Sequence, residues 1–374
     1  MNAQNRFTIA VLAGDGIGPE IMAPTLGLLR EVENRVGGFS LRFDDVPAGA
    51  GLYRDSGTAF PETSKAQTRA ADAILLAAMG QPDVRYPDGT EISPQLDLRV
   101  DLDLYAGIRP VRLIPGLDLP LADPRAKDID LVLVRESTEG LFASHGKGKV
   151  EDDSIATDTM VITRKASERL FDFAFGLARR RKKKGRPGRV TCVDKANVFT
   201  SFAFFRKVFG ERAAYYEDIE ADCSYVDAMA LNLVRQPWGY DVLVTENMFG
   251  DILSDLGASL MGGMGMAPSA DIGDNHAVFQ PCHGSAPDIV GSGKANPTAM
   301  FLSAAMMLEW LGETHENPKC VKAGEMIRRA VDHAFASGDL VPTELGGDAG
   351  LERIAAKVAA ALGAAPTPSV AVPA

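Results

Sequence analysis

The sequence lacks the features that mark several classes of protein. No apolar stretch approaches the roughly 20 residues of a membrane-spanning helix, and no basic segment followed by the apolar core of a secretory signal opens the chain. The four cysteines show no CxxC spacing, which favours reduced thiols over a zinc site or a disulfide scaffold. A net charge of −11 argues against a nucleic-acid partner, because phosphates are bound by basic faces. We therefore expect a cytoplasmic protein without a membrane or nucleic-acid partner.

The composition and the order of apolar segments predict an α/β fold. The 374 residues are 46% hydrophobic and 24% charged, which is ordinary for a globular chain of one large or two medium domains. Amphipathic helical stretches alternate with short apolar runs that are typical of strands, at 7–12, 73–79, 130–134, 189–193 and 241–245. This alternation predicts a mostly parallel sheet with helices on both faces.

Residues 241–266 carry the most informative pattern. After the strand at 241–245, a helical stretch places Asp251 and Asp255 one turn apart on the same helix face. Carboxylates this close repel each other unless a cation lies between them, and their oxygens suit Mg²⁺ or Mn²⁺. A solvated helix face with two unrelated acids would show the same spacing. The position just past a buried strand, where open α/β sheets bind ligands, favours the metal site.

Three arginines each lie close to the end of an apolar element. Arg99 and Arg109 flank an amphipathic stretch, and Arg135 follows the strand at 130–134. Guanidinium groups bind carboxylates through two parallel hydrogen bonds, so the three side chains could clamp a carboxylate-rich substrate. Taken singly, each arginine fits an ordinary surface ion pair equally well.

Lys195 and Asp227 are candidate catalytic residues. Lys195 lies just past the strand at 189–193, where its surroundings could tune it as an acid or base, although an exposed lysine would fit the same place. Asp227 falls in a helical stretch among positions that we expect to face the core. A buried carboxylate needs a compensating cation, and the metal proposed above could supply it.

Two glycine-containing loops are candidates for binding a cofactor. Residues 14–20, GDGIGPE, connect a strand to a helix, but their GxGxG spacing differs from the GxGxxG fingerprint of an ordinary dinucleotide site. In the second loop, at 280–289, small residues let the backbone approach a ligand. There Asp288 could accept hydrogen bonds from a ribose diol and repel a 2′-phosphate.

Five motifs occur in one order along the chain: GDGIGPE at 14–20, DKANV at 194–198, YVDAMALNLV at 225–234, TENMFGDILSDLGASL at 245–260 and HGSAPDIVGSGKANP at 283–297. Together they resemble the NAD(P)-dependent β-decarboxylating dehydrogenases, which include the 3-isopropylmalate, isocitrate, homoisocitrate and tartrate/D-malate dehydrogenases. The resemblance covers essentially the whole chain to about residue 362. A match of five motifs in order is far more specific than any one of them.

The resemblance implies an isopropylmalate-dehydrogenase-like fold of two domains, with a large mixed, mostly parallel sheet flanked by helices. Residues 1–104 and 263–362 would form the first, cofactor-side domain, and residues 105–262 the second. The polar, β-prone segment at about 143–165 would be an arm at the interface of a homodimer with shared active sites. The Pro/Ala-rich tail at 363–374 is predicted to be disordered.

The resemblance also implies a role for each candidate residue. The substrate, a small hydroxy-dicarboxylate, would contact Arg99, Arg109, Arg135, Gln95, Leu96 and Phe142. The metal, Mg²⁺ or Mn²⁺, would be held by Asp251, Asp255 and Asp227 of the partner subunit. Lys195 of the partner subunit would act as acid and base at the C2 hydroxyl, and Asp227 would come from the same subunit. NAD would bind at His283, Gly284, Ser285, Ala286, Pro287, Asp288, Ile289 and Asn296, and the pair Asp288–Ile289 favours NAD over NADP.

Two positions depart from the family pattern. Where the family has a tyrosine that protonates the enol, this chain has Phe142, and a phenyl ring cannot transfer a proton. Either water, His145 or another group replaces it, or the final protonation is slow, or the reaction differs. Where isopropylmalate enzymes have two leucines, this chain has Gln95 and Leu96, and a buried amide disfavours an isopropyl group.

We therefore predict the NAD- and metal-dependent oxidative decarboxylation of a 3-substituted or unsubstituted D-malate to a 2-oxo acid and CO₂. A 3-isopropylmalate-type enzyme agrees best with the motifs, a tartrate/D-malate type agrees better with Gln95, and a homoisocitrate type is the third alternative. A different class remains open, a non-catalytic relative that binds NAD and ligand as a regulatory subunit. Phe142 is its support, and the retained Lys195 argues against it.

Overall fold

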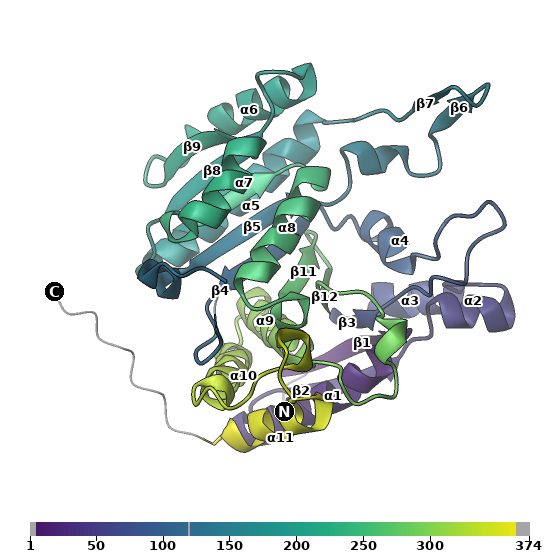
Figure 1. The fold of residues 1–374 in the computed structure, drawn as a ribbon, viewed down its shortest axis with the longest axis vertical. Coiled ribbons are helices and arrows are strands. Elements are labelled where there is room, and N and C mark those ends of the chain that lie inside the picture. Colours follow the sequence, from purple (N-terminus) through teal and green to yellow (C-terminus); the bar gives the residue numbers. More distant parts are fainter. Residues whose placement is uncertain (1–4, 119, 364–374) are drawn as a thin grey trace.

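A ten-stranded sheet runs through the whole of the computed structural model, which describes residues 5–118 and 120–363 (Figure 1). From one edge to the other its strands are β2 (Ser40–Asp45), β1 (Arg6–Gly14), β3 (Ala73–Ala78), β12 (Ala277–Pro281), β11 (Pro268–Ile272), β4 (Ala106–Arg112), β5 (Asp130–Glu136), β10 (Val242–Thr245), β8 (Arg189–Asp194) and β9 (Glu220–Tyr225). The first five strands come from the two ends of the chain and the other five from its middle, so the sheet has two halves that meet between β11 and β4.

The outer parts of the sheet are parallel and its centre is antiparallel. Neighbouring strands run parallel from β2 to β12 and again from β5 to β9, whereas β11 and β4 pair antiparallel with both of their neighbours. Every residue of β3 and β10 is buried, as expected for strands that are covered on both faces. The predicted α/β fold with a mixed, mostly parallel sheet is therefore confirmed.

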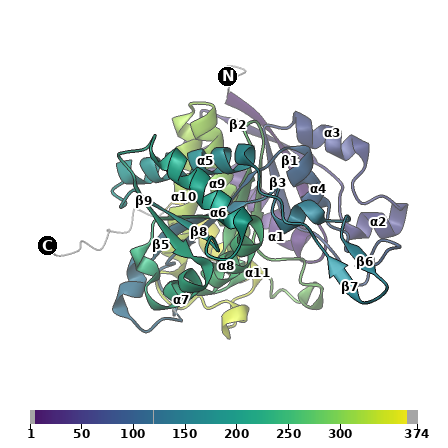
Figure 2. The same ribbon diagram turned by 90° about the horizontal axis from the view of Figure 1, so that it is seen from above.

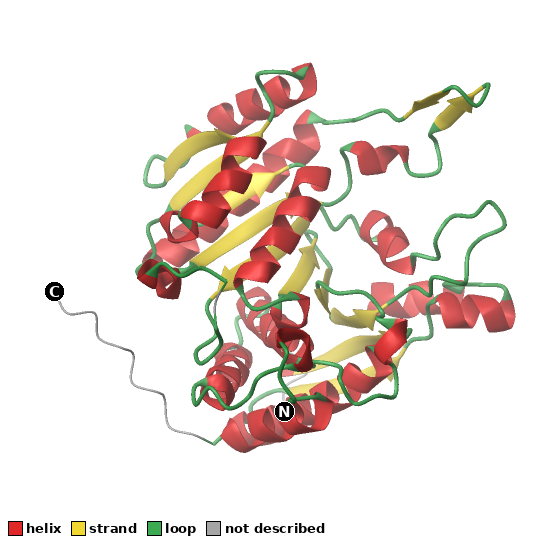
Figure 3. Cartoon of the chain, in the orientation of Figure 1, coloured by secondary structure: helices red, strands yellow, loops and turns green. Residues whose placement is uncertain are grey.

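Helices cover both faces of each half (Figures 1 and 3). In the first half, one face is covered by α1 (Gly18–Val36) and α9 (Thr298–Thr314), with α10 (Pro318–Phe335) and α11 (Leu351–Ala361) outside them. The opposite side carries α2 (Ala50–Ser56), α3 (Glu62–Ala70) and α4 (Pro94–Asp101), which lie together in Figures 1 and 2. In the second half, α5 (Arg164–Lys183) and α6 (Thr200–Ala213) cover one face, and α7 (Val226–Arg235) and α8 (Asn247–Leu260) cover the other.

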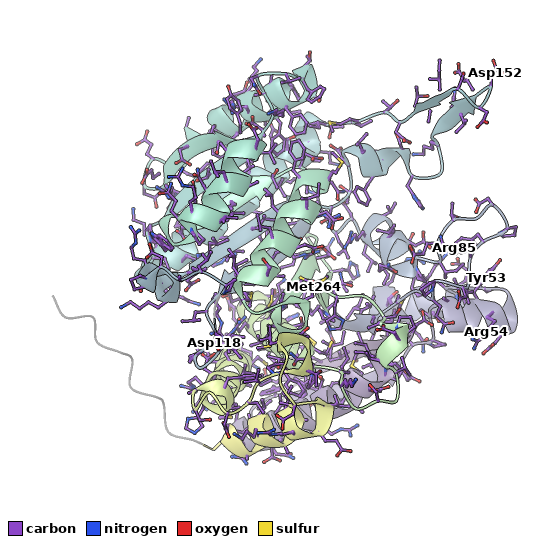
Figure 4. The ribbon with its side chains drawn as sticks, viewed as in Figure 1. Tyr53, Arg54, Arg85, Asp118, Asp152 and Met264 are labelled. Atoms are coloured by element: carbon purple, nitrogen blue, oxygen red, sulfur yellow. The ribbon has the colours of Figure 1, made fainter. Side chains whose placement is uncertain are left out.

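A small β hairpin protrudes from the second half. Strands β6 (Lys149–Glu151) and β7 (Ile155–Thr157) pair antiparallel, and all six of their residues are exposed. Asp152, at the turn between them, stands away from the body of the molecule in Figure 4. The hairpin lies inside the predicted arm at 143–165, and its pairing with a second chain stays a prediction.

The domain boundaries also stay a prediction, because the sheet is continuous through both halves. The tail predicted to be disordered, 363–374, lies outside the described residues except for Gly363. No helix within residues 5–118 and 120–363 combines the length and the apolar character needed to cross a bilayer.

Candidate active site

A cavity of about 180 Å³ opens between the two halves of the molecule, beside the centre of the sheet. Strand β3 and helix α4 line it from the first half, and strand β5 and helix α8 line it from the second. The predicted site residues on its wall are Gln95, Arg99, Arg109, Arg135, Asp251, Asp255, His283 and Gly284. Residues far apart in the sequence therefore meet at one polar cavity.

The three predicted arginines are buried and converge on this cavity. Arg135 on β5 pairs with Gly107 on the antiparallel strand β4, two residues from Arg109, so both side chains leave the same face of the sheet. Arg99 reaches the cavity from α4. The exposed fractions of Arg99, Arg109 and Arg135 are only 9%, 5% and 3%, which excludes ordinary surface ion pairs. Burial, and then the nearby Arg99 charge, lowers the pKa of Arg135 to about 10. Crowded cations of this kind require an anion.

Two residues that the sequence did not single out hold these guanidinium groups. Asp271 on β11 accepts a hydrogen bond from Arg99 Nε at 3.1 Å and a longer one from Arg109 Nη2 at 3.4 Å. Asn247, at the start of α8, accepts from Nε and Nη2 of Arg135 at 3.0 and 2.7 Å. Each arginine thus has a fixed partner behind it, which fixes the direction in which its free nitrogens point.

Helix α8 carries the two predicted metal ligands. Its N-terminus is capped by Glu246, whose carboxylate accepts from Phe249 N at 2.7 Å and Met248 N at 3.1 Å. One turn into the helix, Asp251 forms an ion pair with Arg135, and Asp255 follows at the next turn. Partial burial, and then the Asp251 charge, raises the pKa of Asp255. Two carboxylates in mutual repulsion at a cavity wall are a suitable donor set for a hard divalent cation.

Lys195 and Asp227 form a pair outside this cavity. Lys195 Nζ donates to Asp227 Oδ1 at 2.5 Å, and neither residue lines the cavity of its own chain. The prediction that Asp227 faces the core is wrong: its side chain is 67% exposed, because α7 buries Met229 and Leu233 on its other side.

The three predicted metal ligands do not assemble within one chain. Among the described residues, one group of three potential ligands lies within 4.8 Å, and it consists of Cys192, Asp194 and Cys223. Asp194 is already occupied there by two hydrogen bonds from Arg206, at 2.7 and 2.8 Å. Asp227 therefore lies apart from Asp251 and Asp255 in this chain, and its place among the metal ligands stays a prediction.

A second cavity, of about 610 Å³, adjoins the first, since His283 and Gly284 line both. Of the predicted cofactor residues, its wall contains His283, Gly284, Ala286, Ile289 and Asn296. Ser285 is buried, and Pro287 and Asp288 are exposed. The sequence did not point to Glu344, which also lines this cavity and accepts from Asn296 Nδ2 at 2.8 Å, nor to Met264 at its edge (Figure 4).

The glycine turn at 14–20 supports this loop from behind. Ile17 N donates to Ser285 O at 2.9 Å, and a Cβ added at Gly16, whose φ is +59°, would lie 2.0 Å from the same oxygen. Asp15 accepts from the backbone nitrogens of Ala50, Gly51 and Gly80 at 2.8 to 2.9 Å. The turn is therefore a structural anchor of the candidate cofactor loop.

His283 offers an unused acceptor where the two cavities meet. Its Nδ1 lies 2.9 Å from the carbonyl oxygen of Gly284, so Nδ1 carries the proton of the neutral ring. Nε2 is buried and has no hydrogen-bond partner among the described residues. Burial lowers the pKa of His283 below its usual 6.5, which keeps the ring neutral at pH 7.

Gln95 and Phe142, which depart from the family pattern, lie at different places in the structure. Gln95 lines the first cavity, and its Oε1 is buried without a partner among the residues described, whereas Leu96 is not part of the cavity wall. Phe142 lies on the 3₁₀ helix η3 (Leu141–Ser144), where the Arg135 guanidinium stands 5.3 Å from its ring centre. The phenyl ring thus packs against the arginine cluster.

This chain is similar to known proteins along nearly its whole length. Residues 8–359 match the family profile described as isocitrate/isopropylmalate dehydrogenase. The 3-isopropylmalate/3-methylmalate dehydrogenase of Methanocaldococcus jannaschii is 42% identical, over 94% of this chain and 97% of the relative. The homoisocitrate dehydrogenase of the same organism is 40% identical, over 91% and 93%. The crystal structure of isocitrate dehydrogenase from Methylococcus capsulatus superposes with a TM-score of 0.83 at 36% identity, covering 95% of this chain and 99% of that one.

Proposed function

The chain belongs to the isocitrate/isopropylmalate dehydrogenase family, and from this premise we propose that it oxidises and decarboxylates a 3-substituted D-malate to a 2-oxo acid and CO₂. As a member of that family it is an NAD-dependent decarboxylating dehydrogenase acting on a CH–OH group. Relatives with 3-isopropylmalate dehydrogenase in their names support a substrate of the 3-isopropylmalate type. One observation carries the proposal: three buried guanidinium groups share a cavity with the carboxylates of Asp251 and Asp255.

The arginines bind and orient the substrate. Guanidinium groups that are buried and held from behind present their free nitrogens at fixed angles, and these match carboxylate oxygens. Two carboxylates of a malate would neutralise the crowded positive charge that lowers the pKa of Arg135. The same contacts hold the C2–C3 bond in one orientation, which positions C2 for oxidation.

Mg²⁺ or Mn²⁺ and NAD fit the residues present. Asp251 and Asp255 offer hard oxygen ligands one turn apart. Burial, and then the Asp251 charge, raises the pKa of Asp255, and a bound cation would offset both effects. For NAD, the cavity of about 610 Å³ has the unused Nε2 of His283 at its inner end. When bound, the cation supplies Lewis acidity at the C2 oxygen and NAD accepts the hydride. Asp288 supports a preference for NAD, since its carboxylate would repel a 2′-phosphate.

Lys195 is proposed to take the proton of the C2 hydroxyl as the base of the reaction. Since Lys195 and Asp227 lie outside the cavity of their own chain, this role requires a homodimer in which each chain completes the site of its partner. Phe142 cannot protonate the carbon that loses CO₂, so water or another group must do so. A cytoplasmic location stays a prediction.

A tartrate or D-malate dehydrogenase activity is the second candidate, and Gln95 favours it. A buried amide oxygen without a partner is costly in free energy, and a hydroxyl donor on the substrate would satisfy it, whereas an isopropyl group would not. The C3 substituent is therefore the main property to measure. Homoisocitrate is the third alternative, and a non-catalytic regulatory relative is the alternative from another class.

The deciding experiment is NADH formation with Mn²⁺ on 3-isopropylmalate, D-malate, tartrate, isocitrate and homoisocitrate, compared by kcat/KM. We expect turnover of at least one malate that carries two carboxylates. Preference for 3-isopropylmalate would show that Gln95 does not exclude an apolar substituent, and preference for D-malate or tartrate would favour the second candidate. Retained NAD binding without turnover of any substrate would contradict the proposal and favour a regulatory protein.

A further inference from the structure

Asp271 is the most completely enclosed charge in the candidate active site. It lies on β11 in the antiparallel centre of the sheet, and only 1% of its surface is exposed. Arg99 Nε and Gln280 Nε2 donate to its Oδ2 at 3.1 and 2.7 Å, and Arg109 Nη2 and Ser137 Oγ lie 3.4 Å from its Oδ1. Four polar side chains, three from different elements and one just past the end of β5, therefore converge on one carboxylate.

The opposing strand leaves room for this carboxylate. Asp271 pairs with Gly107 on β4, where an added Cβ would stand 3.0 Å from Oδ1 of Asp271 and 2.7 Å from Oγ of Ser137. A side chain at position 107 would push the carboxylate away from Arg109. The absence of a side chain there thus allows a charged group to occupy the centre of the sheet.

The ionised form of Asp271 is stabilised by its neighbours. Burial alone raises its pKa, but the Arg99, Arg109 and Arg135 charges together lower the pKa of Asp271 below its usual value. The carboxylate is therefore negative at neutral pH.

Asp271 also fixes the orientation of the two arginines. Arg99 has no hydrogen-bond acceptor other than Asp271 among the described residues, and it uses only Nε, which leaves both terminal nitrogens for a ligand. Arg109 is held at Nη1 by Ala270 O at 3.0 Å and at Nη2 by Asp271. Both guanidinium groups consequently face the cavity in a geometry set from β11.

The charge of the cavity follows from this arrangement. Among the described residues, the cavity wall contains three arginines, Arg99, Arg109 and Arg135, and no lysine. Asp271 neutralises one of these three charges, and Gln95 adds an amide without charge. Asp251 and Asp255 also line the cavity, and the divalent cation proposed above would offset their two negative charges. With that cation bound, the arginine cluster retains a net charge of about +2, which matches two carboxylates and leaves a third without a partner.

We propose that Asp271 is a positioning residue that sets the specificity of this site, restricting it to 2-hydroxy acids with two carboxylates and a C3 substituent without charge. This inference rests on the proposed function and narrows it, because it disfavours isocitrate and homoisocitrate, which carry a third carboxylate. It leaves 3-isopropylmalate, D-malate and tartrate as candidates.

The first test measures binding without turnover. Isothermal titration of the wild-type chain, with saturating Mn²⁺ and without NAD, compares glutarate with tricarballylate, which has the same five-carbon chain and one additional carboxylate. We expect glutarate to bind more tightly. Tighter binding of tricarballylate would overturn the inference, and this measurement needs no variant.

The second test removes the charge with Asp271→Asn. The ratio of the two dissociation constants should shift in favour of tricarballylate by at least about tenfold, because one negative charge behind the arginines is lost and the cavity becomes more positive. The matched control is Asp241→Asn, which alters another carboxylate that is 1% exposed and paired with an arginine, Arg181, but lies outside the cavity. The control should lower stability and leave the ratio unchanged. An unchanged ratio in Asp271→Asn would show that Asp271 is only structural.

Failure of the inference and failure of the proposed function give different results. If no malate is oxidised but Asp271→Asn shifts the ratio of the two dissociation constants, the proposed reaction is wrong and the proposed role of Asp271 holds. If 3-isopropylmalate or D-malate is oxidised but isocitrate has an equal or higher kcat/KM, the reaction holds and the role of Asp271 is wrong.

Discussion

Lys195 and Asp227 lie 2.5 Å apart, Nζ to Oδ1, on a part of the second half that does not face the cavity of the same chain. Lys195 follows β8 directly, and Asp227 lies in the first turn of α7, so two adjacent strands, β8 and β9, bring the pair together. Neither residue lines the cavity of its own chain, so the role that we propose for the pair requires the site of a second chain.

Mixing two inactive variants tests the shared site. Lys195→Met and Asp255→Asn should each be inactive as homodimers. After random subunit exchange about half of the dimers are mixed, and each has one intact site of two, so about a quarter of wild-type activity should return. Mixing Lys195→Met with Lys195→Ala is the control and should restore nothing. No recovery in the first mixture, with exchange verified by mass, would contradict shared sites.

Removal of the divalent cation should lower thermal stability. A cation that binds only the folded chain stabilises it by about 2.7 kcal/mol at a hundredfold excess over Kd. We expect Mn²⁺ to raise the melting temperature, EDTA to reverse the rise, and Asp255→Asn to abolish most of it. Glu325→Gln, which changes an exposed carboxylate on α10, should keep the full response. A normal Mn²⁺ response in Asp255→Asn would exclude this residue as a ligand.

Glu246 should matter for the stability of α8. Its carboxylate accepts two of the free backbone N–H groups at the start of this helix, and it is 2% exposed. Glu246→Ala should lower the free energy of unfolding by about 1 to 2 kcal/mol in urea titrations. Glu246→Gln keeps an acceptor oxygen, so it should lose less. Glutamine replaces one of the two acceptor oxygens with an amide nitrogen, so equal losses in the two variants would show that the one acceptor oxygen that remains does not stabilise the helix.

His283 should make stability fall on mild acidification. Burial lowers its pKa in the folded chain below the value of 6.5 expected in the unfolded chain. The unfolded chain therefore takes up the proton first, so the contribution of His283 is complete above pH 6.5 and is lost as the pH falls through the folded-state pKa. Urea titrations between pH 7.5 and 5 should show a smaller loss for His283→Asn than for the wild type. The exposed His145 provides the control, and His145→Asn should keep the wild-type slope.

The local pattern of the sequence was sufficient to predict most of the strands and helices and many of the residues at the candidate active site. The strand at 241–245 and the helix that carries Asp251 and Asp255 are confirmed as β10 and α8. They could be predicted because the spacing of apolar residues that defines a strand or a helix involves only residues close together in the chain. Places close to apolar elements also led to Arg99, Arg109 and Arg135, which meet at one cavity.

Other parts of the site were decided by the tertiary structure alone. Asp271 lies 162 residues from Arg109, and the two meet because β11 pairs with β4, which no spacing in the sequence reveals. Glu344 reaches Asn296 in the same way. The prediction for Asp227 was wrong for a related reason. Its place in an amphipathic pattern predicted a buried side chain, but in the folded chain this position of the helix faces solvent. The sequence by itself determined the elements and the charged groups at their ends, since these depend on short-range geometry. The order and register of the strands, which only the folded chain contains, decided which charges face each other.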